Sequence, residues 1–327
     1  MEFPTIGIVS MGDMGHAVGR TLREGGYNIL AALEGRSDRT CALAQHAGVE
    51  NVGSLTAMVQ QADLILSIMP PAAATGFAQS VAAEMQSTAS TPLFVDCNAI
   101  APATTRTISE IIGDAGADFV DGGIIGAPPG RRTPTRLYVS GPGADRLQEL
   151  VRPDFLIRSI GNEIGAASGI KMFYAALTKG TMTLDTLVLL GARQMGLSAP
   201  LLEEFSASQP EALARMERSV PWLAADAERW VGEMEEIAKT FSDIGLTDRM
   251  HQGAAEVFRL LATTDLASET RESADRSRRL DEAVEAFAVR LSASRPDAQD
   301  QKTEKAVMAA DHLNGLCHPT VPAGANA

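Results

Sequence analysis

The chain has 327 residues, of which 45% are hydrophobic, and a formal net charge of −13 from 28 basic and 41 acidic side chains. This length and composition predict a globular protein with two domains, each large enough to bury its own core. The acidic balance weighs against nucleic acids and anionic membranes as partners. No apolar run is long enough to span a membrane, and the N-terminus lacks the features of a secretion signal.

The three cysteines, Cys41, Cys97 and Cys317, are far apart in the sequence. Such a sparse and odd-numbered set favours a reducing, cytoplasmic location over a disulfide framework. The five histidines do not occur at the spacings of zinc ligands, so we expect no metal site.

The first motif is a glycine turn between a strand and a helix. Residues 5–9 are a short apolar run of β type, and a helical pattern follows that ends at Gly25 and Gly26. The turn consists of Ser10, Met11, Gly12, Asp13, Met14 and Gly15. In this context glycines let the backbone approach a pyrophosphate, which binds at the helix N-terminus. Because Ser10 replaces the first glycine of such a fingerprint, an ordinary tight turn remains the alternative.

The second predicted strand, residues 28–33, is followed by Glu34, nineteen residues after the last glycine of the turn. An acid near this spacing binds the ribose hydroxyls of NAD, whereas arginine and serine beyond the strand suit the 2′-phosphate of NADP. Arg36, Ser37 and Arg39 supply such donors. They favour NADP, with NAD as the alternative.

Strands and helices alternate up to residue 160. We predict further helices over 55–61, 76–85 and 102–113, and further strands over 63–69, 93–96, 118–121, 136–140 and 155–160. This alternation predicts an α/β domain with a mostly parallel sheet covered on both faces. Ligands of such sheets bind at the carboxyl ends of the strands. The segments expected around one crevice are 10–15, 34–39, 69–70, 96–102 and 121–129.

A long helical segment lies within residues 161–196. Its apolar run, 172–190, predicts a helix that is buried on most sides. One stripe of this helix carries Lys171, Tyr174, Thr178 and Asp185. Lys171 either extends to water or pairs with Asp185, or it is a desolvated lysine with a lowered pKa that serves as an acid or base.

The rest of the chain predicts helices only. Helical periodicity covers 201–205, 212–218, 221–245 and 248–263. We expect the charged segment 268–279 to be a solvated loop or face, and His251 to be a solvated histidine at a helix start. Residues 318–327 lack core-forming side chains and are expected to be disordered.

Five segments in this order resemble the β-hydroxyacid dehydrogenase family, the relatives of 6-phosphogluconate and 3-hydroxyisobutyrate dehydrogenases. They are the glycine turn, the segment 67–70 (SIMP), the segment 96–102 (DCNAIAP), the segment 121–127 (DGGIIGA) and the segment 161–174 with its lysine. Each segment is weak evidence alone, but five in register are hard to obtain by chance.

The resemblance implies an architecture of three parts: a Rossmann NAD(P)-binding domain over 1–163, an interdomain helix over 164–196 and an all-helical substrate and dimerisation domain over 197–317. The residues 318–327 form the tail. The helical part matches a branch of the family whose C-terminal domain is uncharacterised. The implied partners are a small-molecule substrate and a second copy of the chain, with no nucleic acid and no membrane.

The resemblance also implies site residues. NADP, or NAD, is bound by the glycine turn and by Glu34, Arg36, Ser37, Met69, Pro70 and Asn98. Lys171 corresponds to the general acid/base for hydride transfer between nicotinamide C4 and the carbinol carbon of a hydroxy-acid-like substrate. Asn98 orients the nicotinamide carboxamide or, as an alternative, serves as a structural cap.

The chain departs from the family at three places. Asn98 and Ala99 replace its Ser-Thr, Ile125 to Ala127 replace its carboxylate-binding Ser-Gly-Gly, and Tyr174 or Ala175 replaces an asparagine after the lysine. These changes indicate a substrate that is bulkier or less acidic than a small hydroxy acid. The residues expected to bind it are Gly123, Ile124, Ile125, Gly126, Lys171, Tyr174 and His251. The Tyr174 phenol either donates a hydrogen bond to the reacting oxygen or only packs.

Two other functions remain open for this chain, an imine reductase and a dinucleotide-binding sensor without turnover. Retention of Lys171 favours alcohol chemistry over imine reduction. A second lysine that relatives carry on a later helix is not recognisable, and Glu233 lies at the aligned place. Whether Glu233 or His251 takes over part of its role is open.

Overall fold

The computed structural model describes residues 2–270 and 273–293. The first half of the chain forms an eight-stranded sheet with the order β3-β2-β1-β4-β5-β6-β7-β8. The strands are β1 Thr5–Val9, β2 Asn28–Ala31, β3 Glu50–Asn51, β4 Leu64–Ser67, β5 Leu93–Asp96, β6 Phe119–Ile125, β7 Thr135–Ser140 and β8 Phe155–Ser159. All neighbours pair in parallel except β6 and β7, which are antiparallel. The order reverses between β1 and β4, where ligands of open α/β sheets bind.

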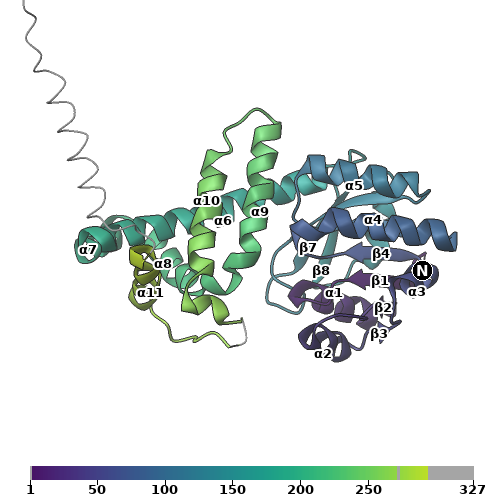
Figure 1. The fold of residues 1–327 in the computed structure, drawn as a ribbon, viewed down its shortest axis with the longest axis horizontal. Coiled ribbons are helices and arrows are strands. Elements are labelled where there is room, and N and C mark those ends of the chain that lie inside the picture. Colours follow the sequence, from purple (N-terminus) through teal and green to yellow (C-terminus); the bar gives the residue numbers. More distant parts are fainter. Residues whose placement is uncertain (1, 271–272, 294–327) are drawn as a thin grey trace, which may run out of the picture.

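Helices cover both faces of the sheet (Figure 1). They are α1 Asp13–Glu24, α2 Asp38–Ala47, α3 Leu55–Gln61, α4 Pro71–Thr88, α5 Pro102–Asp114 and the 3₁₀ helix η1 Ala144–Leu150. Buried residues of α1, α2 and η1 share one apolar cluster with the sheet, and those of α3, α4 and α5 share another. Strand β4 is buried throughout because Leu64 and Leu66 belong to one cluster and Ile65 to the other.

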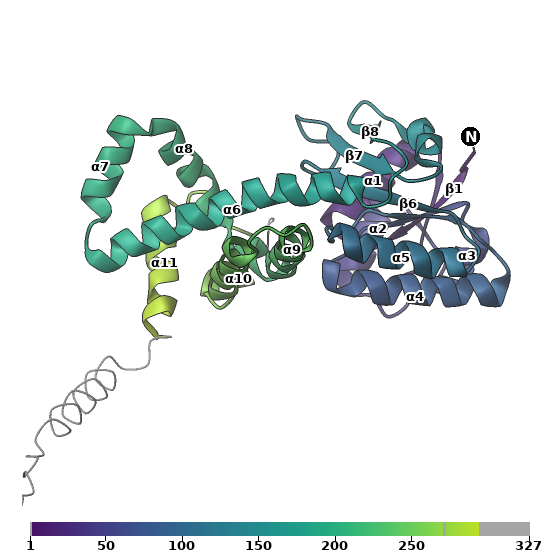
Figure 2. The ribbon, with the colours of Figure 1, turned by 90° about the horizontal axis from the view of Figure 1, so that it is seen from above.

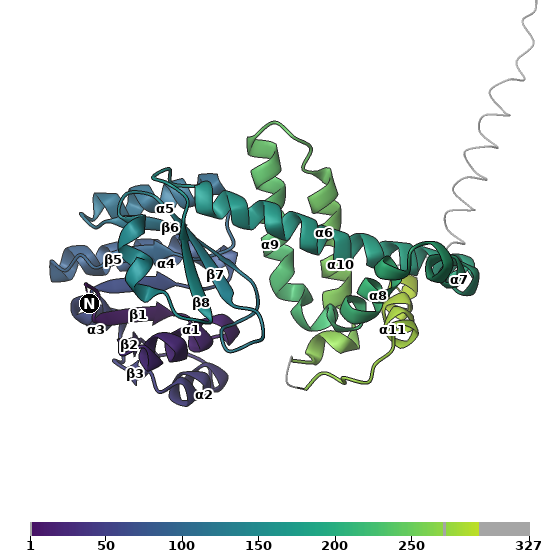
Figure 3. The ribbon, with the colours of Figure 1, turned by 180° about the vertical axis from the view of Figure 1, so that it is seen from behind.

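A single helix, α6 Ala166–Met195, connects the sheet to the remaining helices (Figures 2 and 3). It begins after Gly165 and ends at Gly196, and both glycines have a positive φ that other residues rarely adopt. The helices that follow are α7 Ser198–Ser208, α8 Pro210–Ser219, η2 Val220–Trp222, α9 Ala224–Asp243, α10 Arg249–Ala262, η3 Asp265–Ser268 and α11 Leu280–Ala293. They form a second core with α6, in which Met172, Ile237 and Phe258 are buried.

One carboxylate attaches the helical part to the sheet domain. Glu236 of α9 accepts hydrogen bonds from the backbone N–H of Ala101, at 2.7 Å, and from the Thr104 hydroxyl, at 3.1 Å. These groups lie at the N-terminus of α5, where helix N–H groups lack partners and a negative charge is favoured. This contact holds α9 beside the N-terminus of α5, in the part of the chain that follows β5.

The α/β class and the helical second half are confirmed. Helix α2 and the two-residue strand β3 were not predicted, and β6 extends to Ile125 because its residues 121–125 pair with β7. The prediction that the long helix is buried on most sides was wrong. Leu177 is 73% exposed, Leu184 59% and Met195 74%, so α6 presents an apolar stripe to solvent. None of the helices in the described residues is long and apolar enough to cross a membrane.

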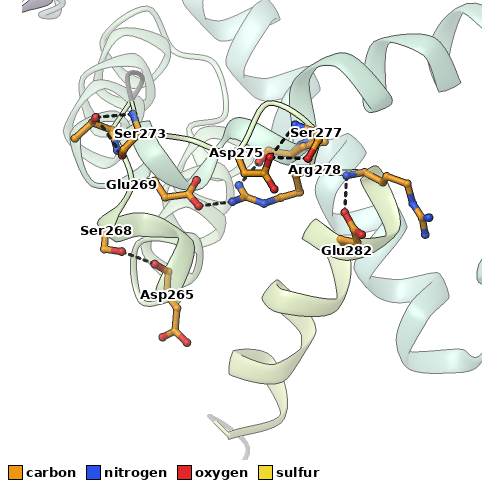
Figure 4. Close-up of polar contacts among 11 residues, drawn as sticks. Asp265, Ser268, Glu269, Ser273, Asp275, Ser277, Arg278 and Glu282 are labelled. Carbon is orange, nitrogen blue, oxygen red and sulfur yellow. Dashed lines mark hydrogen bonds and ion pairs between the residues drawn. The ribbon is translucent and has the colours of Figure 1, made fainter.

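The charged segment 268–279 is only partly the solvated loop that we expected (Figure 4). The Arg278 side chain is 10% exposed, because it pairs with Glu269 and donates to the Pro221 carbonyl at 3.1 Å. The pair with Glu269 lies within the segment, and the bond to Pro221 attaches the segment to η2. The expected disorder of 318–327 concerns residues that lie outside those described.

Candidate active site

A cavity of about 340 Å³ opens at the carboxyl ends of β1, β2 and β4. Five residues predicted to bind the cofactor line it, namely Ser10, Met11, Glu34, Arg36 and Met69. The cavity lies at the point where the strand order reverses. It is therefore where a dinucleotide binds in sheets of this kind.

The glycine turn brings the start of α1 close to β1. Gly12 is the N-cap residue of α1, and a Cβ atom on Gly15 would lie 1.9 Å from the Ser10 carbonyl oxygen. Only glycine therefore allows this approach of helix to strand. Met14 packs against the core of the sheet, and Asp13 pairs with Arg39 at 2.6 Å.

The three residues after β2 that were predicted to donate hydrogen bonds to the 2′-phosphate have different environments. The Ser37 hydroxyl caps α2 by accepting a hydrogen bond from the backbone N–H of Thr40, and Arg39 pairs with Asp13. Arg36 lines the cavity together with Glu34. Arg36 is thus the member of the predicted set that the cavity exposes to a ligand.

Asn98 is almost fully buried, and three of its hydrogen bonds lie within the protein. Its Nδ2 donates to the Ser67 hydroxyl at 2.9 Å and to the Asp96 carboxylate at 3.0 Å, and its Oδ1 accepts from the Met69 N–H at 2.6 Å. Both N–H groups of Nδ2 therefore already have protein partners. This network fixes Met69 at the edge of the cavity, and Pro70 then begins α4 as its N-cap residue. Burial raises the pKa of Asp96 to about 7, although the Asn98 hydrogen bonds oppose this shift.

A buried carboxylate fixes the start of α6. Asp121 of β6 accepts hydrogen bonds from the Gly165 N–H at 2.9 Å, from the Ser168 hydroxyl at 2.5 Å and from the Ser140 hydroxyl at 3.0 Å. Burial raises the pKa of Asp121, while these hydrogen bonds oppose the shift. The first turn of α6 is thereby anchored to β6 and β7.

Lys171 lies just beyond this anchor, where α6 passes β6. A Cβ atom on Gly123 would lie 2.6 Å from the Ala167 carbonyl oxygen and 3.0 Å from the Lys171 Cβ, so glycine permits this contact. Burial lowers the pKa of Lys171, nearby Glu233 opposes this shift, and the positive charge of Arg229 adds to it. Asp185 is paired with Arg215 at 3.0 Å and is not the partner of Lys171.

Another lysine of α6, which is buried, was missed in the sequence. Lys179 lies two turns after Lys171 on α6, pairs with Glu233 of α9 and has its Nζ 5.2 Å from the Trp230 ring centre. Burial lowers the pKa of Lys179 to about 8, although Glu233 acts in the opposite direction. The spacing of eight residues from Lys171 was the available signal, because it places both lysines on one side of a helix.

Glu233 is charged at neutral pH despite its burial. Desolvation acts to raise its pKa, but Lys179, Lys171 and Arg229 together hold the pKa of Glu233 below its usual value. The two lysines, one carboxylate and Trp230 therefore form a cluster between α6 and α9, which we call the lysine cluster. Within residues 2–270 and 273–293, no three His, Cys, Asp or Glu side chains gather as metal ligands.

The remaining predicted substrate residues have differing environments. His251 is 8% exposed and lies against Phe241 with ring centres 4.5 Å apart, so the expectation of a solvated histidine was wrong. Burial lowers the pKa of His251, and its Nδ1 has no hydrogen-bond partner. Ile124 and Ile125 are buried within β6, and Gly126 ends that strand with φ of 115°. Tyr174 is 47% exposed on α6.

Two family descriptions match this chain. Residues 5–164 match the NAD binding domain of 6-phosphogluconate dehydrogenase, and residues 192–261 match a domain of unknown function, DUF1932. Together, the two matched domains fit the β-hydroxyacid dehydrogenase family. The resemblance inferred from five motifs, including an uncharacterised helical C-terminal domain, is thereby confirmed.

Solved structures agree with this assignment. The conserved protein MTH1747 of unknown function, described as structurally similar to 3-hydroxyacid dehydrogenases, is 26% identical with a TM-score of 0.57 over 79% of this chain and 96% of its own. The 3-hydroxyisobutyrate dehydrogenase of Mycobacterium tuberculosis, solved with L-serine, is 16% identical with a TM-score of 0.61, covering 86% and 98%. An imine reductase of Myxococcus stipitatus in complex with NADP+ is 18% identical with a TM-score of 0.51, covering 79% and 93%.

At 16% and 18% identity, the last two structures establish a common fold. The matched NAD-binding domain and this fold support an NAD(P)-dependent oxidoreductase with a nicotinamide cofactor. Dehydrogenases and imine reductases both share the architecture, so the chemistry must be argued from the residues of this chain.

Proposed function

We propose that this protein transfers a hydride between the carbinol carbon of a hydroxy-acid-like substrate and NADP, with Lys171 as the general acid/base. The observation that carries this proposal is the environment of Lys171. It is a partly buried lysine with a lowered pKa, on a helix anchored to the sheet by Asp121. A lysine must be neutral to accept a proton, and a lowered pKa increases the neutral fraction near neutral pH.

The residues fit a dinucleotide. The cavity at the ends of β1, β2 and β4 and the close approach at Gly15 are the features that such a ligand requires. In this proposal, the N-terminus of α1 holds the pyrophosphate, while Glu34 and Arg36 hold the adenosine ribose. Arg36 favours the 2′-phosphate of NADP. When bound, the nicotinamide supplies the hydride acceptor.

The lysine cluster sets the protonation of Lys171. In the oxidative direction, the Lys171 Nζ takes the proton of the substrate hydroxyl, and in the reductive direction it returns that proton. Glu233 alone would stabilise the protonated lysine, but it is already paired with Lys179. The positive charge of Arg229 further disfavours the protonated form of Lys171. Lys179 and Glu233 therefore act in this proposal as positioning residues.

Tyr174 lies three residues after Lys171 and keeps about half of its surface exposed. We retain it as a donor to the reacting oxygen of the substrate. A Tyr174→Phe variant keeps the ring and removes only the hydroxyl. We expect it to lower kcat by roughly tenfold to a hundredfold with little change in cofactor affinity.

The deciding experiment compares the wild type with Lys171→Met on a panel of hydroxy acids and branched or aryl alcohols, with NADP and with NAD. Lys239→Met is the matched control, since Lys239 is an exposed lysine on α9. We expect kcat/KM to fall by about three orders of magnitude in Lys171→Met only, with the dissociation constant of the cofactor unchanged. Equal activity in Lys171→Met and wild type would exclude this role.

The same assay, extended to cyclic imines with NADPH as the hydride donor, separates the alternatives. Reduction of cyclic imines without oxidation of any alcohol would identify an imine reductase. Micromolar cofactor binding without turnover on any substrate would identify a dinucleotide sensor.

We also propose a homodimer formed through the helical domain. The exposed stripe of α6 includes Phe173, Leu177, Leu184, Leu187 and Met195. Next to its end, a mainly apolar groove of about 570 Å³ lies between α6, α7 and α11. A second copy of the chain would bury both surfaces, which an isolated protomer leaves in water.

A further inference from the structure

Three helices, α5, α6 and α9, meet beside the sheet domain, and α5 and α9 lie on the same side of α6 (Figure 2). Pro102, the first residue of α5, packs against the first turns of α6. A Cβ atom on Gly165 would lie 3.2 Å from the Pro102 Cβ, and one on Gly169 would lie 3.8 Å from the Pro102 Cγ. The hydroxyls of Thr105 and Ser168 share a hydrogen bond of 2.7 Å. The start of α5 is therefore held to α6 within one turn of the proposed acid/base.

Helix α9 joins this junction through Glu236. One oxygen of its carboxylate, Oε2, accepts both hydrogen bonds from the start of α5, from the Ala101 N–H and from the Thr104 hydroxyl. In a capping box, the third residue of a helix accepts from the N–H of its own N-cap residue. Here Ala101 is the N-cap residue and Thr104 is the third residue, and Thr104 donates to Glu236 instead. A residue of α9 thus supplies the acceptor that α5 lacks.

Side-chain packing leaves a gap at this junction. A cavity of about 300 Å³ lies between α5, α6 and α9, and its walls include Pro102, Gly169 and Thr240. Thr240 follows Glu236 by one turn of α9. The hydrogen bonds of Glu236 therefore bridge two helices that packing leaves apart on this side.

The segment before α5 connects the junction to the cofactor cavity. Asn98 accepts a hydrogen bond from the Met69 N–H at 2.6 Å, and Met69 lines that cavity. Ala99 packs against the core of the helical domain, and Ala101 donates to Glu236. A shift of α9 at Glu236 would therefore move the residues that border the cofactor cavity.

Helix α9 also connects the junction to the lysine cluster. Glu233 precedes Glu236 by three residues, so both carboxylates lie on one side of α9. Glu233 pairs with Lys179. Burial lowers the pKa of Lys171, and two residues of α9 modify it, since Glu233 raises this pKa and Arg229 lowers it. Glu236 thus holds in place the helix that sets the environment of the proposed acid/base.

We infer that Glu236 is a positioning residue, whose carboxylate holds the start of α5 against α9 and thereby fixes Lys171 relative to the residues that border the cofactor cavity. The inference rests on the proposed function for its link to turnover. Hydride transfer and proton transfer act on one substrate, so both sides of the site must be correctly placed at the same time. A misplacement of about 1 Å can slow such a reaction by about a hundredfold.

The first test observes the lysines directly and needs no turnover. The chain has five lysines, so the ¹³Cε signals of the lysine-labelled full chain can be followed one by one in an NMR pH titration: Lys171, Lys179, Lys239, Lys302 and Lys305. The signal missing from Lys171→Met identifies Lys171. We expect Glu236→Ala to move the Lys171 titration to higher pH, because a loosened α9 admits water and burial is the main cause of the lowered pKa.

Two further variants test the hydrogen bonds themselves. Glu236→Gln keeps an oxygen acceptor, so it should restore most of the wild-type titration. Thr104→Val removes one donor from the α5 side and keeps the shape, so it should move the titration in the same direction by less. It also provides the test if Glu236→Ala does not fold.

Glu235→Ala is the matched control, because Glu235 is the neighbouring residue on the exposed side of α9 and pairs with Arg259. We expect its Lys171 signal to titrate as in the wild type. An unchanged titration in both Glu236→Ala and Thr104→Val would overturn the inference. An equal shift in Glu235→Ala would overturn it as well, since the effect would then not come from the contact with α5.

The second test measures rates. We expect Glu236→Ala to lower kcat by roughly tenfold to a hundredfold with little change in the dissociation constant of NADP, and Glu236→Gln to recover most of this loss. A shifted Lys171 titration without turnover of any substrate by the wild type would leave the contact standing and reject the dehydrogenase. An active wild type with an equal kcat in Glu236→Ala would support the dehydrogenase and reject the positioning role.

Discussion

At the scale of single residues, two lysines on one helix have different environments. Lys179 is paired with Glu233, so its charge is compensated, whereas Lys171 shares the same carboxylate only at a distance. Burial lowers the pKa of both lysines, and Glu233 raises both. The proton affinity of Lys171 therefore depends on the Glu233 carboxylate, which is paired with Lys179.

We predict that the pH profile of alcohol oxidation reports this coupling. Because the reaction requires neutral Lys171, kcat/KM should rise with pH and level off at a pH below the ordinary lysine pKa. Glu233→Gln removes the charge that raises the pKa of Lys171, so the rising limb should move to lower pH. Glu235→Gln, on the exposed side of α9, should leave the limb in place. A limb that moves to higher pH in Glu233→Gln would contradict this account.

Lys179 also predicts a pH dependence of stability. Its pKa is about 8 in the folded protein, against an ordinary value of 10.5. Between these values the unfolded chain binds more protons, so the free energy of unfolding should rise with pH by up to about 3 kcal/mol. Urea unfolding from pH 7 to pH 10.5 measures this rise. The rise should be smaller in Lys179→Met and unchanged in Lys239→Met, and equal slopes in all three proteins would contradict the prediction.

At the scale of elements, glycines set how closely helices approach strands. Gly15 allows α1 to meet the Ser10 carbonyl, and Gly123 allows α6 to meet β6. The first contact shapes the glycine turn and the second determines where Lys171 lies. In both cases backbone atoms block a side chain, and backbone atoms cannot turn aside as the end of a flexible side chain can.

We predict that Gly15→Ala weakens cofactor binding at least about tenfold, because the methyl group must push α1 away from β1. Fluorescence titration with NADPH measures the dissociation constant. The matched control is Gly113→Ala in α5, where an added Cβ atom meets nothing within 4 Å. This control should gain roughly 0.5–1 kcal/mol of stability and keep wild-type affinity. Wild-type affinity in Gly15→Ala would show that the turn does not hold the cofactor.

At the scale of the whole molecule, the exposed stripe of α6 is the feature that a single chain leaves unexplained. Leu184 lies near the middle of this stripe and is 59% exposed. Burying a leucine contributes about 1.5–3 kcal/mol, so a second copy covering the stripe would be strongly stabilised. The same contact would cover the groove between α6, α7 and α11.

We predict that the wild type sediments as a dimer and that Leu184→Glu shifts it toward the monomer by at least about a hundredfold in dissociation constant, because a charge would be buried at the interface. Analytical ultracentrifugation over a concentration series measures this. Leu246→Glu, at an exposed leucine between α9 and α10, should remain dimeric. A monomeric wild type at micromolar concentration would refute the proposed dimer.

The sequence alone determined most of the order of strands and helices, without α2 and β3, as well as the glycine turn and the resemblance to a known family, and it singled out Lys171 as a candidate acid/base. These features are visible because strand and helix periodicities and glycine turns are local properties of the chain. The exposure of α6 could not be read in the same way, since an apolar stripe has the same pattern whether it faces a core or a partner.

Only the tertiary structure brought the residues of the lysine cluster together. Lys179 and Glu233 are 54 residues apart in the sequence. The same is true of Glu236 with Ala101 and of Asp121 with Gly165. Each pair depends on how α6 and α9 pack against the sheet, and that packing arises from apolar surfaces distributed over the whole chain.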